Sequence, residues 1–187
     1  SCWWESNGYI WSIWIHIYNI INYIYLFNYS NISIYLEMML KIKTHKATPA
    51  DANIIGPVFD LYRIFYKQKS NVEEANRYIR ARLEANESII FFIKDKERCI
   101  GFTQLYPTFD SVKLRKKIVL YDLFICEDYR RKGNGKILMD AAKDYAQLNK
   151  FGSIELSTNK GNIQGQSLYE ALGYIRDQEF YSYDLEI

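Results

Sequence analysis

The chain has 187 residues, of which 49% are hydrophobic and 25% charged, with 24 Lys and Arg against 22 Asp and Glu. This length predicts one domain, or one domain with a short appendage, and the composition excludes a wholly disordered chain. The small net charge of +2 also excludes a protein that binds nucleic acid through bulk electrostatics, although a local anion site stays open.

Cysteine and histidine are scarce. Cys2, Cys99 and Cys126 are far apart and form no C-x-x-C pair, so neither a disulfide scaffold nor a zinc site is supported. His16 and His45 are the only histidines, which argues against a His-based triad or a His-rich metal site. We therefore expect no metal and a reducing, cytoplasmic location.

The composition changes abruptly near residue 40. All four Trp lie in the first fourteen residues, and the first Lys or Arg is Lys41. The uncharged stretch 10–27 is almost long enough to span a bilayer, but polar residues interrupt it and no secretory signal pattern is present. We interpret residues 1–40 as a non-native or disordered leader, either translated upstream sequence or an artefact. A membrane or partner anchor and a folded extension remain as alternatives.

The remaining residues, 41–187, carry a formal charge of +4 and the pattern of one folded domain. Alternating residues predict a strand over 41–47, and the Thr48-Pro49-Ala50-Asp51 stretch predicts the start of a helix that ends near Tyr66. Asn71, which is followed by acidic residues, predicts the N-cap of a second helix.

Strands and helices then alternate along the chain. Apolar runs over 88–94 and 99–106 flank a polar turn and predict two antiparallel strands, and a further strand is expected over 117–126. After a basic turn, the expected elements are an amphipathic helix carrying Ile137 to Leu148, a strand over 153–157, a helix over 162–172, and Tyr174 with residues 180–185 closing the sheet. This order predicts a mixed α/β layer fold.

The basic turn between strand and helix has the chemistry of an anion site. Free backbone N–H groups and the helix dipole favour a phosphate there, and glycines let the backbone approach it closely. The turn is not a Walker A loop, because Ile137 follows Lys136, and it lacks the third Gly of a dinucleotide fingerprint. A merely solvated loop is the alternative.

Two spaced motifs resemble those of a known superfamily. Arg130, Gly133 and Gly135 form R-x-x-G-x-G directly after the strand, which resembles the acetyl-CoA pyrophosphate loop of the GNAT acetyltransferases. Asn162 to Tyr174 resembles that superfamily's N-x-x-A-x-x-x-Y-x-x-x-G-F pattern, with Gly and Tyr in place of Ala and Phe. Over roughly residues 42–187, the resemblance implies the GNAT acyl-CoA N-acyltransferase fold, a three-layer α/β/α arrangement around a mostly antiparallel sheet.

The same resemblance implies a binding region for acetyl-CoA. Its pyrophosphate would meet the loop N–H groups, and its pantetheine arm would pair with the strand. The implied residues are Phe124, Ile125, Arg130, Arg131, Lys132, Gly133, Asn134, Gly135, Lys136 and Asn162. Asn162 could instead cap its own helix.

Two residues are candidates for proton transfer. By the resemblance, Tyr169 would protonate the departing CoA thiolate, since a phenol stays protonated at neutral pH; simple packing is the alternative. Asp122 lies within an apolar strand, where a buried charge needs a partner, so it would meet the substrate amine, a relaying water or a structural partner. Cys126 has no His partner nearby, which disfavours an acyl-cysteine mechanism.

The acceptor pocket is less clearly marked. Phe102, Gln104 and Tyr106 share one face of a strand, and Gln104, Tyr106 and Asp110 could bind the acceptor or could only satisfy hydrogen bonds of the sheet. Diamine acetyltransferases, which this segment resembles, carry an acidic pair where the chain has Tyr121 and Asp122. A polyamine substrate is therefore doubtful.

We expect an enzyme that moves acetyl from acetyl-CoA to a primary amine of a small molecule or peptide, by direct attack in a ternary complex. A non-catalytic CoA-sensing or protein-binding module is the alternative. No nucleic-acid partner is expected, membrane association is disfavoured, and a homodimer stays open. The sequence leaves the acceptor unidentified.

Overall fold

The computed structural model describes Tyr18 and residues 42–187, and the interpretation of residues 1–40 as a leader falls outside this part of the chain apart from Tyr18. The domain of residues 42–187 contains five strands, β1 to β5, together with the helices α2 to α5 and two short 3₁₀ turns. Their bounds are β1 Thr44–Lys46, η1 Pro49–Asp51, α2 Ala52–Phe65, α3 Val72–Glu84, β2 Ile89–Asp95, β3 Arg98–Asp110, β4 Arg115–Ile125, η2 Glu127–Tyr129, α4 Asn134–Leu148, β5 Ile154–Leu156 and α5 Ile163–Ala171.

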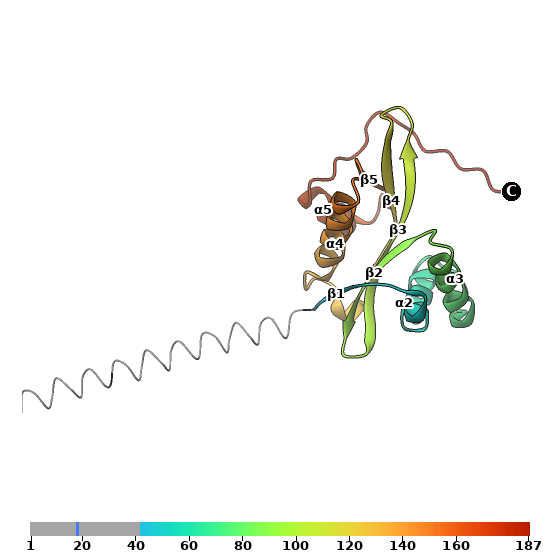
Figure 1. Ribbon diagram of the computed structural model, residues 1–187, viewed down its shortest axis with the longest axis vertical. Helices are drawn as coiled ribbons and strands as arrows, with labels where there is room; N and C mark the ends of the chain where they lie inside the picture. The colour runs from blue at the N-terminus through green and yellow to red at the C-terminus, as the bar shows by residue number, and fades with distance from the viewer. Residues whose placement is uncertain (1–17, 19–41) are drawn as a thin grey trace, which may run out of the picture. The chain divides into compact units, whose positions relative to one another are not determined.

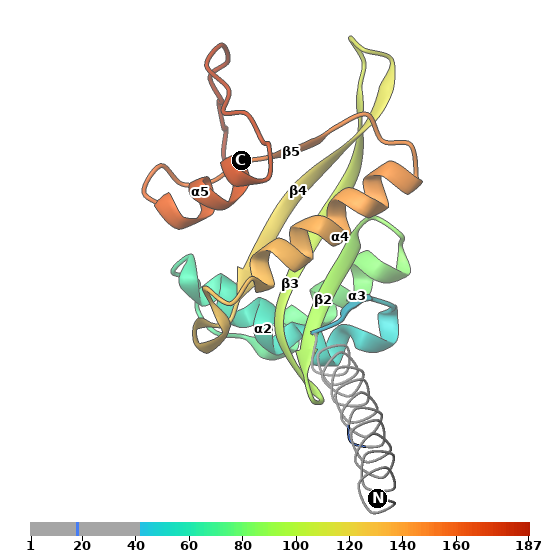
Figure 2. The same ribbon diagram turned by 90° about the vertical axis from the view of Figure 1, so that its left-hand side faces the viewer.

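The five strands form one sheet in the order β1-β2-β3-β4-β5. Neighbouring strands are antiparallel except β4 and β5, which are parallel. Helix α4 covers one face of the sheet, and α2 and α3 lie against the other face (Figure 1 and Figure 2). The predicted mixed α/β fold with a mostly antiparallel sheet is confirmed.

One irregularity in the β3–β4 ladder decides which side chains face which layer. Gln104 pairs with Asp122, but the next residue of β3, Leu105, pairs with Leu120. Tyr121 is therefore an extra residue in β4, and such a bulge reverses the alternation of side chains. Leu120 packs in the core on the α4 side, whereas Phe124, beyond the bulge, packs on the α2 side. Asp122 accordingly faces α2.

Helices α2 and α3 are held together by close contact and by a buried carboxylate. A Cβ atom at Gly56 would lie 1.8 Å from Asn76 Oδ1, so glycine lets the two helices approach. Asp60, only 2% exposed, accepts hydrogen bonds from Arg63, from the Ser70 hydroxyl and from the Asn71 N–H group. These bonds fix the connection between the helices.

The end of the chain differs from the expectation. No strand forms over residues 180–185, and Tyr174 lies after α5 with its ring 6.1 Å from that of Tyr169. The Asp177 carboxylate accepts the N–H groups of Glu179 and Phe180, which turns the chain locally. The segment after this turn pairs with no strand of residues 42–187, so its apolar side chains remain exposed, and the predicted closing strand is wrong.

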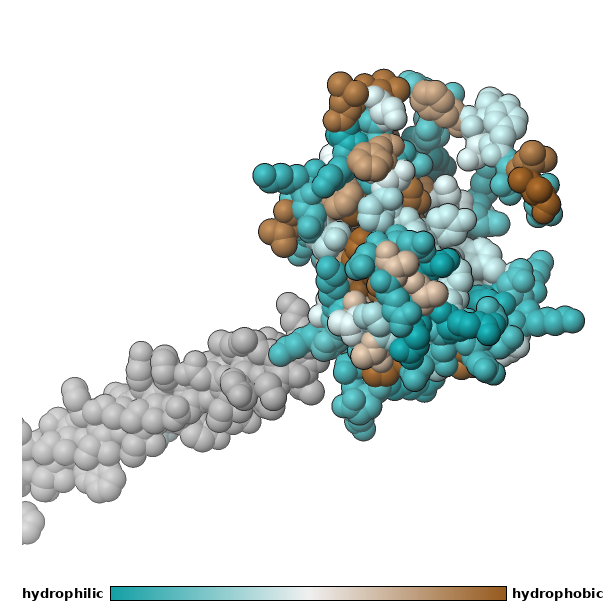
Figure 3. Space-filling view, turned by 45° about the vertical axis from the view of Figure 1, so that its right-hand side comes forward, coloured by the Kyte–Doolittle hydropathy of each residue, from teal (hydrophilic) through white to brown (hydrophobic). Residues whose placement is uncertain are grey.

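The surface of the domain in Figure 3 is mostly hydrophilic and carries separate hydrophobic patches. Within Tyr18 and residues 42–187, no helix combines the length and the apolar character that a bilayer span requires. The anchor considered for residues 10–27 lies outside the described residues, apart from Tyr18.

Candidate active site

A cavity opens beside β4, between the end of α2 on one side and β5 with α5 on the other. Its volume is about 280 Å³, which suits a small ligand. The lining residues are Tyr62, Phe65, Tyr66, Leu120, Tyr121, Leu123, Phe124, Ile125, Arg130, Gly135, Leu156, Ser157, Thr158, Asn162, Gln164, Gly165, Leu168 and Tyr169. Both sequence motifs therefore contribute to one cavity, although about 30 residues separate them in the chain.

Asp122 lies behind the lining of this cavity: it stands between the lining residues Tyr121 and Leu123 in the chain and next to the lining residue Tyr62. It is only 5% exposed, and burial raises the pKa of its carboxyl from 3.8 to about 6. The Tyr62 hydroxyl, which hydrogen-bonds to this carboxyl, lowers the pKa and offsets part of that rise. The result is a carboxylate able to accept a proton near neutral pH.

A second buried carboxylate shows what a structural role looks like in the same domain. Burial alone would raise the pKa of Asp60, but the Asn71 N–H, Ser70 and Arg63 together lower it. Asp122 forms no ion pair with any cation of residues 42–187. A buried carboxylate left without a cation beside a cavity is a candidate for function rather than for stability.

Tyr169 projects from α5 on the opposite side of the cavity. Its ring is half-buried, and burial raises the pKa of its hydroxyl, while the nearby Thr158 hydroxyl partly opposes that rise. Tyr169 therefore stays protonated at neutral pH. Burial also raises the pKa of Tyr62, and the Asp122 charge adds to this effect.

Asn162 performs the capping role considered for it. Its Oδ1 accepts the Gly165 N–H at 3.1 Å, and its Nδ2 donates to Thr158 Oγ1 at 2.9 Å. The side chain also lines the cavity, so the cap and the predicted contact with a ligand are compatible.

The basic turn is shaped for close approach by a ligand. Arg131 and Gly133 have left-handed φ values of 59° and 81°, and α4 begins directly afterwards at Asn134. The first backbone bond of the helix runs from the Ile137 N–H to the Gly133 carbonyl, so the preceding N–H groups have no intrahelical acceptor. A Cβ atom at Gly133 would meet nothing within 4 Å, which shows that the space beside it is open.

The ten residues predicted to bind acetyl-CoA do not occupy one environment. The cavity is lined by Phe124, Ile125, Arg130, Gly135 and Asn162, whereas Arg131, Lys132, Gly133 and Lys136 are exposed around the turn. Asn134 is only 2% exposed and donates through Nδ2 to the Tyr129 carbonyl at 2.8 Å, so its side chain braces the turn. Arg130 donates to the Ile125 carbonyl at 2.9 Å and lies over the Phe124 ring.

Two of the predicted acceptor residues lie behind the cavity lining, on the α2 and α3 face of the sheet. Gln104 is fully buried and donates through Nε2 to the Ser88 hydroxyl at 2.9 Å, while its Oε1 has no partner among the described residues. The Tyr106 hydroxyl is 3.0 Å from that of Tyr78 on α3, and its ring meets that of Tyr121 edge to face.

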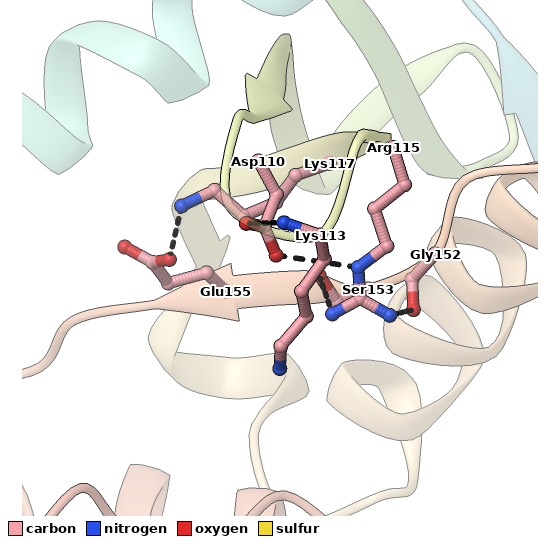
Figure 4. Close-up of polar contacts among 7 residues, drawn as sticks. All are labelled: Asp110, Lys113, Arg115, Lys117, Gly152, Ser153 and Glu155. Atoms are coloured by element: carbon pink, nitrogen blue, oxygen red, sulfur yellow. Dashed lines mark hydrogen bonds and ion pairs between the residues drawn. The ribbon is translucent and has the colours of Figure 1, made fainter.

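The third predicted acceptor residue, Asp110, lies apart from the cavity. It ends β3 at the tip of the β3–β4 hairpin, where it accepts hydrogen bonds from the Lys113 N–H and from Arg115 (Figure 4). Arg115 also donates to the Gly152 carbonyl at 2.9 Å, so this cluster ties the hairpin to the segment before β5.

Sequence reasoning missed the aromatic residues of α2. Tyr62, Phe65 and Tyr66 line the cavity, and Phe59 continues their row toward α3. Their spacing of three and four residues along a predicted helix was the signal that could have found them. No comparable sequence pattern marks Thr158, which lies beside Tyr169.

Comparison with known proteins gives a consistent result. The sequence model of the Acetyltransferase (GNAT) family matches residues 57–174. The N-acetyltransferase YhfO of Bacillus subtilis is 43% identical over 142 residues, which cover 76% of this chain and 95% of the relative. A "Probable acetyltransferase" of Haemophilus influenzae is 30% identical over 122 residues, which cover 64% of this chain and 84% of the relative.

The solved structures agree. The crystal structure of "a probable acetyltransferase" superposes with a TM-score of 0.73 at 33% identity and covers 78% of this chain and 97% of that one. These matches confirm the resemblance that the two motifs carried. The chain belongs to the GNAT acetyltransferase family.

Proposed function

We propose that this protein transfers the acetyl group of acetyl-CoA to the nitrogen of a primary amine, by direct attack within a ternary complex. The observation that carries the proposal is the cavity that Tyr169 lines and that has Asp122 directly behind its lining, next to Tyr62. One group accepts a proton near neutral pH and the other keeps its proton, which are the two properties that acyl transfer to an amine needs.

The turn before α4 fits the pyrophosphate of acetyl-CoA. The N–H groups of Asn134, Gly135 and Lys136 have no intrahelical acceptor, and the helix dipole adds positive potential at this end. Arg131 and Lys132 are exposed beside them and would add positive charge. When bound, acetyl-CoA supplies an acetyl group activated as a thioester.

Asp122 acts as the proton acceptor for the amine. Its carboxylate takes one proton from the bound ammonium, which frees the nitrogen lone pair for attack on the acetyl carbonyl, and the nitrogen gives its second proton to water as the nitrogen–carbon bond forms. The Tyr62 hydroxyl beside it stabilises the charged carboxylate. Tyr169 donates its hydroxyl proton to the departing sulfur, which would otherwise leave as a thiolate.

The test measures both products from one reaction. We expect that incubation with acetyl-CoA and a panel of primary amines releases free CoA and forms one N-acetylated amine for each CoA, as seen by thiol titration and mass spectrometry. Asp122→Asn should lower kcat/KM at least about a hundredfold. Asp144→Asn, at an exposed position on α4, serves as the matched control and should retain the wild-type rate. Tight acetyl-CoA binding without any acetylated amine would contradict the proposal and favour a CoA-binding module.

A further inference from the structure

The wall of the cavity near Asp122 is built from aromatic rings. The Tyr62 ring lies 5.0 Å from that of Tyr66 and 5.9 Å from that of Phe124, and Phe65 lies 6.4 Å from Phe124. On the neighbouring side, Tyr121 is 69% exposed on the bulge of β4. Aromatic faces attract a cation and also bury apolar groups, so they suit a molecule that has both.

The charges around the cavity are unbalanced. Among the described residues that line it, Arg130 is the one charged residue and none is a carboxylate; the Asp122 carboxylate lies behind the lining, next to Tyr62. Negative charge is therefore available for one ammonium group and no more.

We propose that the acceptor is a primary amine with a single positive charge and an apolar or aromatic body, and that amines with a second positive charge are poor acceptors. This inference rests on the proposed function and narrows it to one class of amine. The ammonium meets the Asp122 carboxylate and the faces of Tyr62 and Tyr66, while the carbon body covers the remaining rings.

A second ammonium on the same acceptor has no carboxylate partner. It would lie among Phe65, Tyr66 and Tyr121, whose rings attract a cation but carry no charge to balance it. The positive charge of residues 41–187, a formal +4, opposes it further. Selection against dications thus follows from two features of the wall within residues 42–187: it has no second carboxylate, and its aromatic rings favour an apolar body.

The experiment compares two amines that differ only in the second charge, pentylamine and 1,5-diaminopentane, together with 2-phenylethylamine. We expect kcat/KM for pentylamine to exceed that for the diamine by about tenfold or more, which corresponds to about 1.4 kcal/mol. The diamine has two nitrogens able to react, so statistics alone favour it. 2-Phenylethylamine should equal or exceed pentylamine.

A matched pair of variants tests the cause. Tyr121→Glu places a carboxylate on the exposed bulge beside Asp122, and Tyr121→Gln has nearly the same size without the charge. We expect Tyr121→Glu to raise the diamine-to-pentylamine ratio of kcat/KM at least fivefold over Tyr121→Gln. An unchanged ratio would show that missing negative charge does not set the preference.

The outcomes separate this inference from the proposed function. Equal or better use of the diamine by the wild-type protein overturns the inference and leaves acetyl transfer standing. If no amine of the three is acetylated, the proposed function fails for simple amines, and calorimetry with CoA-saturated protein decides the inference instead. Tighter binding of pentylamine than of the diamine then supports it, and equal or weaker binding overturns it.

Discussion

Asp122 lies directly opposite Gln104 in the β3–β4 ladder, and the bulge at Tyr121 turns the Asp122 side chain away from α4 and toward α2. If the same residues formed a regular strand with no bulge, the carboxylate would share the face of Ile118 and Leu120 on the α4 side. The bulge thus brings the carboxylate to Tyr62 and the cavity. The candidate base and Leu120, two positions apart in the chain, therefore face opposite layers.

Asp122→Asn should make the domain more stable at pH 7.5 while it lowers activity. The folded-state pKa of about 6 lies above the ordinary 3.8, so folding favours the protonated carboxyl and charging it costs stability. This cost is complete above about pH 6 and vanishes below about pH 4. We expect the variant to gain about 1–3 kcal/mol in urea unfolding at pH 7.5 and nothing at pH 3.5.

Asp60→Asn should have the opposite effect on the stability of the domain at pH 7.5. The pKa of Asp60 is lowered by its hydrogen bonds, so its stabilising effect is present above the ordinary value of 3.8 and is lost as the pH falls through the lower folded value. The variant should lose about 1–3 kcal/mol at pH 7.5. Equal effects of the two substitutions at pH 7.5 would contradict the distinct roles assigned to the two carboxylates.

Much of this architecture could be predicted from the sequence. The strands over 88–94 and 117–126 and the cap at Asn71 follow from local patterns, and the structure has them within a few residues. The bulge at Tyr121 could not be found, because register depends on pairing between two strands and not on either alone. The prediction of a strand over 180–185 was wrong for a related reason. Alternating apolar residues permit a strand, but the strand also needs a neighbouring strand to pair with.

The candidate site was predictable where motifs have fixed spacing. The turn at Arg130 to Lys136 and the row from Asn162 to Tyr169 converge on one cavity as the two patterns indicate. Asp110 lies apart from this cavity, because the strand predicted to end at residue 106 continues four residues further, to the tip of a longer hairpin. The aromatic row of α2 needed the tertiary packing to show which of its residues face the cavity.

Tyr169→Phe should lower kcat about tenfold or more with little change in the affinity for acetyl-CoA, because only the hydroxyl proton is removed. Steady-state kinetics and calorimetry measure the two quantities. Tyr174→Phe is the control, since that ring lies 6.1 Å from Tyr169 but does not line the cavity. If both variants keep the wild-type kcat, another group protonates the sulfur.

Gly133→Val should weaken acetyl-CoA binding at least about tenfold. Gly133 has a φ of 81°, which a β-branched residue adopts only with strain, so the turn must rearrange. A Cβ atom at this position meets nothing within 4 Å, and the fold should persist, as judged by far-UV circular dichroism. An unchanged dissociation constant would show that the turn does not hold the pyrophosphate.

A chain that begins at Met39 should fold and bind acetyl-CoA as the full chain does. It retains β1 and every described residue of the cavity, which extends from Tyr62 to Tyr169. Thermal unfolding and calorimetry compare the two chains directly. A large drop in melting temperature for the shorter chain would mean that residues before Met39 contribute to the domain.

The dependence of kcat/KM on pH tests the central claim most directly, because it reports the group that accepts the proton from the amine. With acetyl-CoA and pentylamine as substrates, the wild-type kcat/KM should fall in proportion to acidity below about pH 6, where the buried Asp122 becomes protonated. The residual activity of Asp122→Asn, which depends on amine already deprotonated in solution, should show no change of slope near pH 6. A change of slope of kcat/KM near pH 6 in both proteins, whatever their absolute rates, would contradict the assignment of Asp122 as the proton acceptor.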